Sequence, residues 1–236
     1  QKELEAALAE AEKLGLVELR FEASLALANL DRTPTGATRR ATIAREILAT
    51  FARFVDGGMI PNRFPGLGRP PEYNTADAAL LFIEAVGRTW IASGDEDAST
   101  ANTFLRSLLP TIDEILDAHR AGTRHGIRID PADGLLDQGE AGLQLTWMDA
   151  RIDGAVVTPR AGKAVELSAL LHSAWRWRAR FAAAFGEDDT DFTAAADQIH
   201  ASFDRFWLPD HGYLADVVDG PHGLDGSLRP NQLFAT

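Results

Sequence analysis

The chain has 236 residues, of which 45% are hydrophobic and 25% charged, so it can hold a sizeable core and resembles neither a disordered chain nor a disulfide scaffold. Its 23 basic and 35 acidic residues give a formal net charge of −12, which disfavours nucleic acid and anionic membrane surfaces as partners. It has no cysteine, which is compatible with a cytoplasmic location, and no apolar run reaches the roughly 18 residues of a membrane span.

Apolar periodicity predicts a series of amphipathic helices. Two stretches before residue 31 have helical composition. Apolar residues at steps of three and four then predict helices at about 38–55, 74–92, 102–121, 162–185 and 191–207, with Pro110 bending or splitting the third of them. The best strand candidate, Ala155-Val156-Val157, is too short to build a sheet. The sequence therefore predicts an all-α fold.

The connections between these helices alternate in length. Those at about 94–101 and 186–190 are short, whereas those at 56–74 and 122–161 are long. If consecutive helices pack antiparallel, every second connection lies at the same end of the bundle. Long loops in compact domains are usually functional or disordered, and these are rich in aromatic side chains, which argues against disorder. We therefore expect the functional residues at the end that the long connections share.

Trp147, Met148 and Asp149 stand side by side in the longest connection. Apolar neighbours desolvate a carboxyl group and raise its pKa toward the pH at which enzymes work. Asp149 is therefore the candidate catalytic acid. The alternative is that Asp149 closes a turn while Trp147 packs in the core, because Asp is common in turns.

A second group of charged residues follows Thr158-Pro159 in the sequence. Thr followed by Pro is a normal helix opening, so Arg160, Lys163 and Glu166 are predicted at the mouth of the helix at 162–185. There they could bind a ligand. The alternative is a solvated first turn in which Lys163 and Glu166 form an ion pair at i, i+3.

The earlier long connection offers a set of sugar-binding side chains. Asn62-Arg63-Phe64 and Glu72-Tyr73-Asn74 supply amides, a guanidinium, a carboxylate and aromatic faces. These groups hold sugars through hydrogen bonds to hydroxyls and through ring stacking. The alternative is that Asn74 and Asp77 cap the helix that follows, and that Phe64 closes the end of the helical bundle.

Other catalytic motifs are missing from the sequence. The six histidines are scattered and form no H-E-x-x-H, so no metal and no cofactor are expected. Gly162-Lys163 lacks the remaining residues of a phosphate-binding loop. The segment Asp130-Pro131-Ala132-Asp133-Gly134 lacks the acid spacing of a calcium loop and is predicted to be a turn.

Several segments together resemble the amylo-alpha-1,6-glucosidase domain of glycogen debranching enzymes. They are "GMIPNRFP", "PEYNTADAAL", "GIRIDPADGLLDQGEAGLQLTWMDA", "VVTPRAGKAVEL" and "SLRPNQLFA", in the family's order over about residues 40–236. The resemblance implies a partial (α/α)6 toroid, in which antiparallel helix pairs carry long loops at one end. It implies one incomplete domain over residues 1–236, with divergent helices over 1–37.

The resemblance also implies an activity, which is the inverting hydrolysis of α-1,6-linked glucose at glycogen or limit-dextrin branch points, in the cytoplasm and without a metal. Glycogen or a branched α-glucan oligosaccharide is the expected partner, and the oligomeric state stays undetermined. Asp149 matches the family's proton donor. The expected substrate-binding residues are Asn62, Arg63, Phe64, Tyr73, Asn74, Asp77, Gln144, Trp147, Arg160, Lys163 and Glu166.

Two departures from the family pattern bear on activity. The family's W-G-R-D segment before the first matched helix has no counterpart in "VELRFEASLALANLDRTPTGATRRAT". The family's general base, a Glu near the far end of the domain, is expected beyond Thr236. The alternatives are another inverting glucosidase of glucoamylase or trehalase type, or a non-catalytic glucan-binding or scaffold protein.

Overall fold

The computed structural model describes residues 34–64, 69–94, 97–140 and 142–235, and the helices predicted before residue 31 lie outside this part. The five later helices are confirmed, with ends that differ by a few residues. They are α3 (Pro34–Ala52), α4 (Ala78–Gly94), α5 (Ala98–Ala121), α6 (Val165–Phe185) and α7 (Thr190–Ser202). Helix α5 continues through Pro110, so the predicted split is wrong. None of the described helices is both long and apolar enough to cross a membrane.

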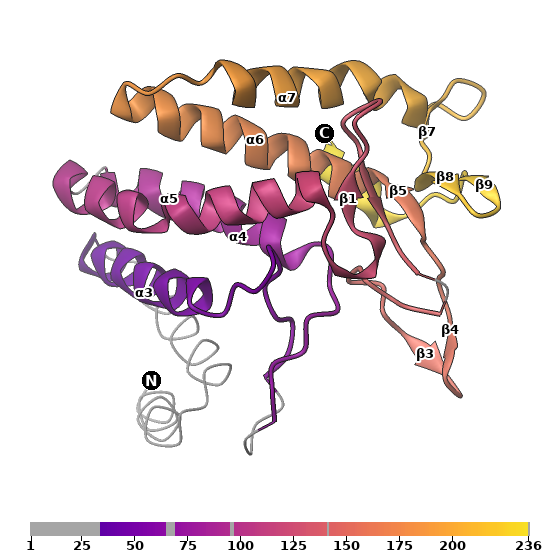
Figure 1. Cartoon of the computed structure of the whole chain (residues 1–236), viewed down its shortest axis with the longest axis horizontal. Helices are drawn as coiled ribbons and strands as arrows, with labels where there is room; N and C mark the ends of the chain where they lie inside the picture. Colours follow the sequence, from indigo (N-terminus) through magenta and orange to yellow (C-terminus); the bar gives the residue numbers. More distant parts are fainter. Residues whose placement is uncertain (1–33, 65–68, 95–96, 141, 236) are drawn as a thin grey trace.

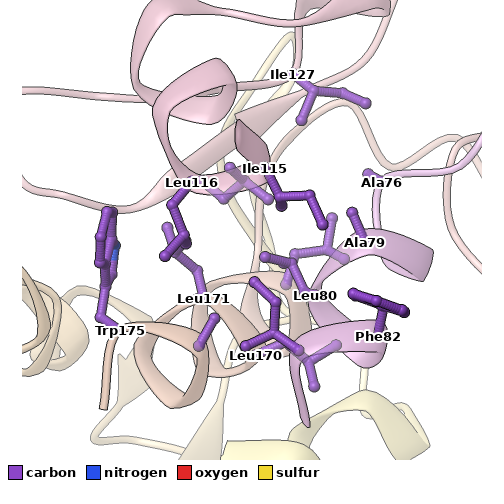
Figure 2. Close-up of a cluster of buried hydrophobic side chains, with 14 of the residues drawn as sticks. Ala76, Ala79, Leu80, Phe82, Ile115, Leu116, Ile127, Leu170, Leu171 and Trp175 are labelled. Atoms are coloured by element: carbon purple, nitrogen blue, oxygen red, sulfur yellow. The ribbon is translucent and has the colours of Figure 1, made fainter. Parts of the chain in front are cut away.

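The helices pack side by side, with α4 against α3, α5 and α6, and with α7 on α6 (Figure 1). Their apolar stripes meet in one core, where Leu80, Ile115 and Leu171 are fully buried (Figure 2). Burying each such side chain is worth about 1.5–3 kcal/mol. Helices α4 and α6 approach closely because Gly87 has no side chain, and a Cβ there would lie 2.3 Å from the Trp177 ring.

The prediction of a fold without strands is wrong. An antiparallel sheet has the strand order β1 (Arg128–Ile129), β2 (Leu136–Gln138), β5 (Gly162–Ala164), β8 (Val217–Gly220) and β9 (Gly223–Asp225). Two further hairpins join β3 (Arg151–Ile152) to β4 (Ala155–Val156), and β6 (Trp207–Leu208) to β7 (Tyr213–Leu214). Strands of two to four residues are too short to show an alternating pattern, which is why periodicity missed them.

The sheet and the long connections lie at one end of the helices, whereas the turn between α6 and α7 lies at the other end (Figure 1). This arrangement confirms the prediction drawn from loop length. In the sheet, Lys163 of β5 pairs with Asp137 on one side and with Val218 on the other. A Cβ on Gly162 would lie 2.8 Å from the Cα of Gly220, so the close approach of β5 and β8 requires glycine at position 162. The sheet thus joins three distant segments beside the start of α6.

Candidate active site

The loop at residues 144–149, here called the acid loop, is attached to the start of α4. The Ala76 N–H donates to the Leu145 carbonyl at 2.6 Å, and the Trp147 N–H donates to Asp77 Oδ2 at 3.1 Å. On the other side, Gln144 Nε2 donates to the Thr158 carbonyl at 3.0 Å. The loop is thereby held at residues 144, 145 and 147 although it contains no helix or strand.

The side chain of Trp147 is held by its edge. Its indole Nε1–H donates to Asn231 Oδ1 at 2.8 Å, while the residue stays 54% exposed. An indole that is anchored by its N–H and open to solvent can stack against a sugar ring. The alternative in which Trp147 packs in the core is wrong, because the residue is 54% exposed, and its role in sugar binding stays a prediction.

Next to the acid loop lies a cluster of ion pairs, here called the buried charge network, in which Arg160, Glu166 and Asp216 are buried and Asp225 and Arg229 are partly buried. Arg160 binds Glu166 with both terminal nitrogens, and its Nη2 to Glu166 Oε2 distance is 2.6 Å. It also donates to Asp216 Oδ2 from Nε at 2.7 Å and to Oδ1 from Nη2 at 3.0 Å. Arg229 Nη1 donates to Asp216 Oδ2 at 2.5 Å and to Asp225 Oδ2 at 2.7 Å.

This network supports the acid loop directly, since Arg160 Nη1 donates to Thr146 Oγ1 at 3.3 Å. Arg160 is 3% exposed, Glu166 2% and Asp216 0%. Burial lowers the pKa of Arg160, but Glu166 and Asp216 outweigh this effect and raise it above its ordinary value. Arg160 therefore stays charged. Its charge compensates the buried Glu166 carboxylate, which would be costly to bury without a cation.

Lys163 occupies a second ion-pair cluster on the same sheet. Its Nζ lies 2.7 Å from Asp130 Oδ2, 2.7 Å from Asp133 Oδ2 and 2.9 Å from Asp219 Oδ2. Burial lowers the pKa of Lys163, but these carboxylates outweigh burial and raise it. Arg205 bridges two of the same acids, Asp133 and Asp219. The ammonium group of Lys163 thus connects the turn at 130–134 to β8.

No group of three His, Asp or Glu side chains among the described residues is placed to hold a metal ion.

The helix opening expected at Thr158-Pro159 is wrong. Helix α6 begins at Val165, so Lys163 lies in β5 and Arg160 precedes that strand. The alternative of a solvated Lys163–Glu166 pair is also wrong, because both residues are buried and pair with other partners. The backbone of Lys163 is extended because it belongs to β5, whereas Glu166 lies in the first turn of α6. The charged groups of Arg160, Lys163 and Glu166 are buried and bind ion-pair partners.

The predicted binding residues of the earlier loop fall into two groups. Arg63 pairs with Glu72 across an isolated bridge, Nη1 to Oε2 3.7 Å, and Phe64 packs edge-on against Phe54 with ring centroids 4.9 Å apart. Tyr73 donates from its hydroxyl to the Phe54 carbonyl at 2.8 Å. Phe64 and Tyr73 therefore hold the loop to the segment that follows α3, whereas Arg63 joins two parts of the loop itself. Two amides, Asn62 and Asn74, are exposed.

Asp77 and Asp149 have contrasting environments. Asp77 accepts from the Thr75 hydroxyl as well as from the Trp147 N–H, so its side chain holds the acid loop. Asp149 is exposed at the far end of that loop, just before β3. The apolar shielding expected from Trp147 and Met148 is therefore not seen around its carboxyl group. Its role as proton donor stays a prediction.

A cavity of about 620 Å³ lies beside the buried charge network. Leu143, residues 156–161 and the hairpin of β8 and β9 line it, with Asp225 and Arg229 in its wall and Asp149 outside it. Its volume is within the range of small-molecule sites. Asp216, Asp225, Arg229 and Asn231 were not among the predicted site residues, although Arg229 and Asn231 lie in the segment "SLRPNQLFA".

The comparisons with known proteins agree with this picture. A family model described as amylo-alpha-1,6-glucosidase matches residues 35–236. The chain is similar to the glycogen debranching enzyme of Saccharomyces cerevisiae, with 28% identity over 188 residues that cover 59% of this chain and 12% of the yeast protein.

Two solved structures share the fold. The GH63 mannosylglycerate hydrolase from Thermus thermophilus, in complex with Tris, has a TM-score of 0.60 at 14% identity over 82% of this chain and 61% of that chain. Its complex with Tris and D-glycerate gives a TM-score of 0.61 at 14% identity over 84% and 62% of the respective chains. The likeness at this identity concerns the fold alone.

The family match assigns these helices, with their long loops at one end, to a family described as amylo-alpha-1,6-glucosidase. The chain belongs to the amylo-alpha-1,6-glucosidase family, as the match over residues 35–236 shows. It spans 12% of the yeast relative and 61% of the mannosylglycerate hydrolase chain.

Proposed function

We propose that this chain acts in the hydrolysis of α-1,6-linked glucose at branch points of glycogen or limit dextrin. The observation that carries the proposal is that Asp77 and Asn231 hold Trp147 while its ring stays exposed, two residues before the exposed Asp149 in the acid loop. The helices would form part of an α/α toroid within a single domain over residues 1–236. The family match supports the substrate class.

In the proposed reaction Asp149 donates a proton to the glycosidic oxygen as the bond to the anomeric carbon breaks. Water attacks the opposite face of the sugar, and the anomeric configuration inverts. A second carboxylate, roughly 6.5–9.5 Å from the acid, accepts a proton from that water. Glu166 is unsuited to this role because Arg160 binds both of its oxygens in a buried site. We assign the base to no described residue.

The other predicted ligands divide by exposure. Trp147 would stack on the glucose ring, and the exposed amides of Asn62 and Asn74 are available to sugar hydroxyls. Arg160, Lys163 and Glu166 would act by holding the loops, since their own charged groups are buried and are bound by other side chains. Gln144 would do the same through its bond to the Thr158 carbonyl.

Another inverting glucosidase activity on the same scaffold is the second candidate. The shared fold with a mannosylglycerate hydrolase favours keeping it, because the scaffold is found with a different substrate. A non-catalytic glucan-binding role is the third, and the exposure of Asp149 is the observation that favours it.

Glucose release tests the proposal. The wild-type protein in its natural length should release glucose from a maltooligosaccharide that carries one α-1,6-linked glucosyl branch, and proton NMR should show the β-anomer first. Asp149→Asn should reduce turnover by about 10²- to 10⁴-fold with unchanged helix content. Asp153→Asn changes another exposed acid in the same connection and should have no effect.

Three results would redirect the proposal. Faster hydrolysis of maltose, trehalose or mannosylglycerate would favour the second candidate. Saturable binding without turnover would favour the third. Equal turnover in wild type and Asp149→Asn would remove Asp149 from the mechanism.

A further inference from the structure

Asn231 connects the acid loop to the buried charge network. It lies in the short 3₁₀ helix η3 (Pro230–Ala235), which packs on α6, and it is 0% exposed. Its Nδ2 donates to Asp216 Oδ1 at 2.7 Å and lies 3.6 Å from Met148 Sδ, while its Oδ1 accepts the Trp147 indole N–H at 2.8 Å. Both ends of one amide are thus used by side chains of the site.

The orientation of this amide is determined by its partners. The Asp216 carboxylate only accepts hydrogen bonds, and the indole N–H only donates them. The amide nitrogen must therefore face Asp216 and the oxygen must face Trp147. Because Asp216 is itself held by Arg160 and Arg229, the acceptor presented to the indole is fixed in space.

Trp147 depends on this acceptor for its direction. Asp77 fixes the backbone N–H of Trp147, which leaves the side-chain rotamer free, and the residue is 54% exposed. An exposed side chain without a polar anchor samples several rotamers. The hydrogen bond to Asn231 selects the Trp147 rotamer in which the Nε1 edge of the indole faces the interior of the protein.

We propose that Asn231 is a positioning residue, which holds the Trp147 indole in the orientation that receives the sugar ring and so determines affinity for the glucan. This inference rests on the proposed function. It predicts that the two side chains act as one unit, because the Asn231 amide affects the ligand only through the ring.

A double-mutant cycle tests this coupling. Titration calorimetry with the singly branched maltooligosaccharide gives the dissociation constant of the parent protein, Trp147→Phe, Asn231→Ala and the double variant, with Asp149→Asn present in all four so that the sugar is not hydrolysed. Trp147→Phe keeps a ring but removes the N–H. Each single variant should weaken binding about tenfold, the cost of one lost buried hydrogen bond, and the double variant should be no weaker than either.

Controls separate positioning from folding. Gln232→Ala changes the next side chain in η3, whose amide contacts the Ser227 carbonyl at 3.4 Å, and should leave the dissociation constant unchanged. A merely structural role of Asn231 would lower the melting temperature and the binding stoichiometry, without changing the affinity of the folded fraction. If Asn231→Ala does not fold, slow hydrogen exchange of the wild-type Trp147 indole N–H still supports the anchor, and exchange as fast as in a free indole overturns it.

The outcomes distinguish this inference from the proposed function. Suppose that the parent protein binds the oligosaccharide and that Trp147→Phe weakens binding. If Asn231→Ala then leaves the affinity unchanged, or if its effect adds in full to that of Trp147→Phe, only the positioning role of Asn231 is refuted. If wild type shows neither binding nor turnover, the proposed function fails and this inference fails with it.

Discussion

Replacing Arg160 by Met should destabilise the protein more than any surface substitution. Arg160 is 3% exposed and is the cation bound to Glu166, which is 2% exposed. Without it, Glu166 becomes a buried carboxylate without a cation, whereas Asp216 keeps Arg229 and Asn231. Breaking a buried pair in this way costs about 3–5 kcal/mol. For a chain of this size each kcal/mol lowers the melting temperature by roughly 2–4 °C.

Urea unfolding followed by circular dichroism measures this loss as a shift of the midpoint at constant slope. Arg128→Met is the matched control, because Arg128 pairs with Asp137 at 3.6 Å in the same sheet with the two side chains 65% and 33% exposed. That pair should contribute about 0–1 kcal/mol. The double variant Arg160→Met/Glu166→Gln should be more stable than Arg160→Met, because it removes the unpaired charge. Equal midpoints for Arg160→Met and Arg128→Met would refute the assigned role of the network.

Three further predictions concern other positions. Burial alone would raise the pKa of Asp225, but hydrogen bonds from Arg229 and Ser227 outweigh it and hold the pKa at about 2. The stability that wild type has over Asp225→Asn should therefore be complete above 3.8, the ordinary pKa, and disappear as the pH falls toward about 2; a urea-midpoint gap that persists at low pH would contradict this. Lys163→Met should lower the free energy of unfolding in urea by about 1–3 kcal/mol. This loss should be smaller than that of Arg160→Met because Asp130 and Asp219, which bind Lys163, are more exposed than Glu166. Equal losses for the two variants would contradict this ranking. Gly87→Ala should lower the melting temperature by several degrees, since its Cβ would enter the Trp177 ring, and an unchanged value would show that α4 and α6 can separate at no cost.

The helices could be predicted because each carries its own signal. The apolar positions of α4 and α5 recur at helical spacing, and the residues they identify are those buried in the core. Loop length then located the functional end, because antiparallel packing makes connection lengths alternate. These inferences use information that lies within single helices and single connections.

The sheet and the buried charge network could not be predicted in this way. Lys163 finds its strand partner at Val218 and its acids at Asp130, Asp133 and Asp219, and no local pattern records pairings over such separations. The same distance explains why Asp216 was missed. Asn231 lies within a segment that the resemblance had identified, yet burial and partners, not residue type, show what its amide does.

Strand β5 leads into α6 without an intervening loop, as Ala164 is the last strand residue and Val165 the first helical one. A helix turns by about 100° per residue, so the strand alignment also determines which side of α6 faces the core. A one-residue insertion or deletion at this junction would either shift the strand or rotate the helix, and would separate Lys163 from its acids or Trp175 from the interior. Length variation in natural relatives should therefore be absent at 162–166 and collect at the tip of the β3–β4 hairpin, where Gly154 has open space around it.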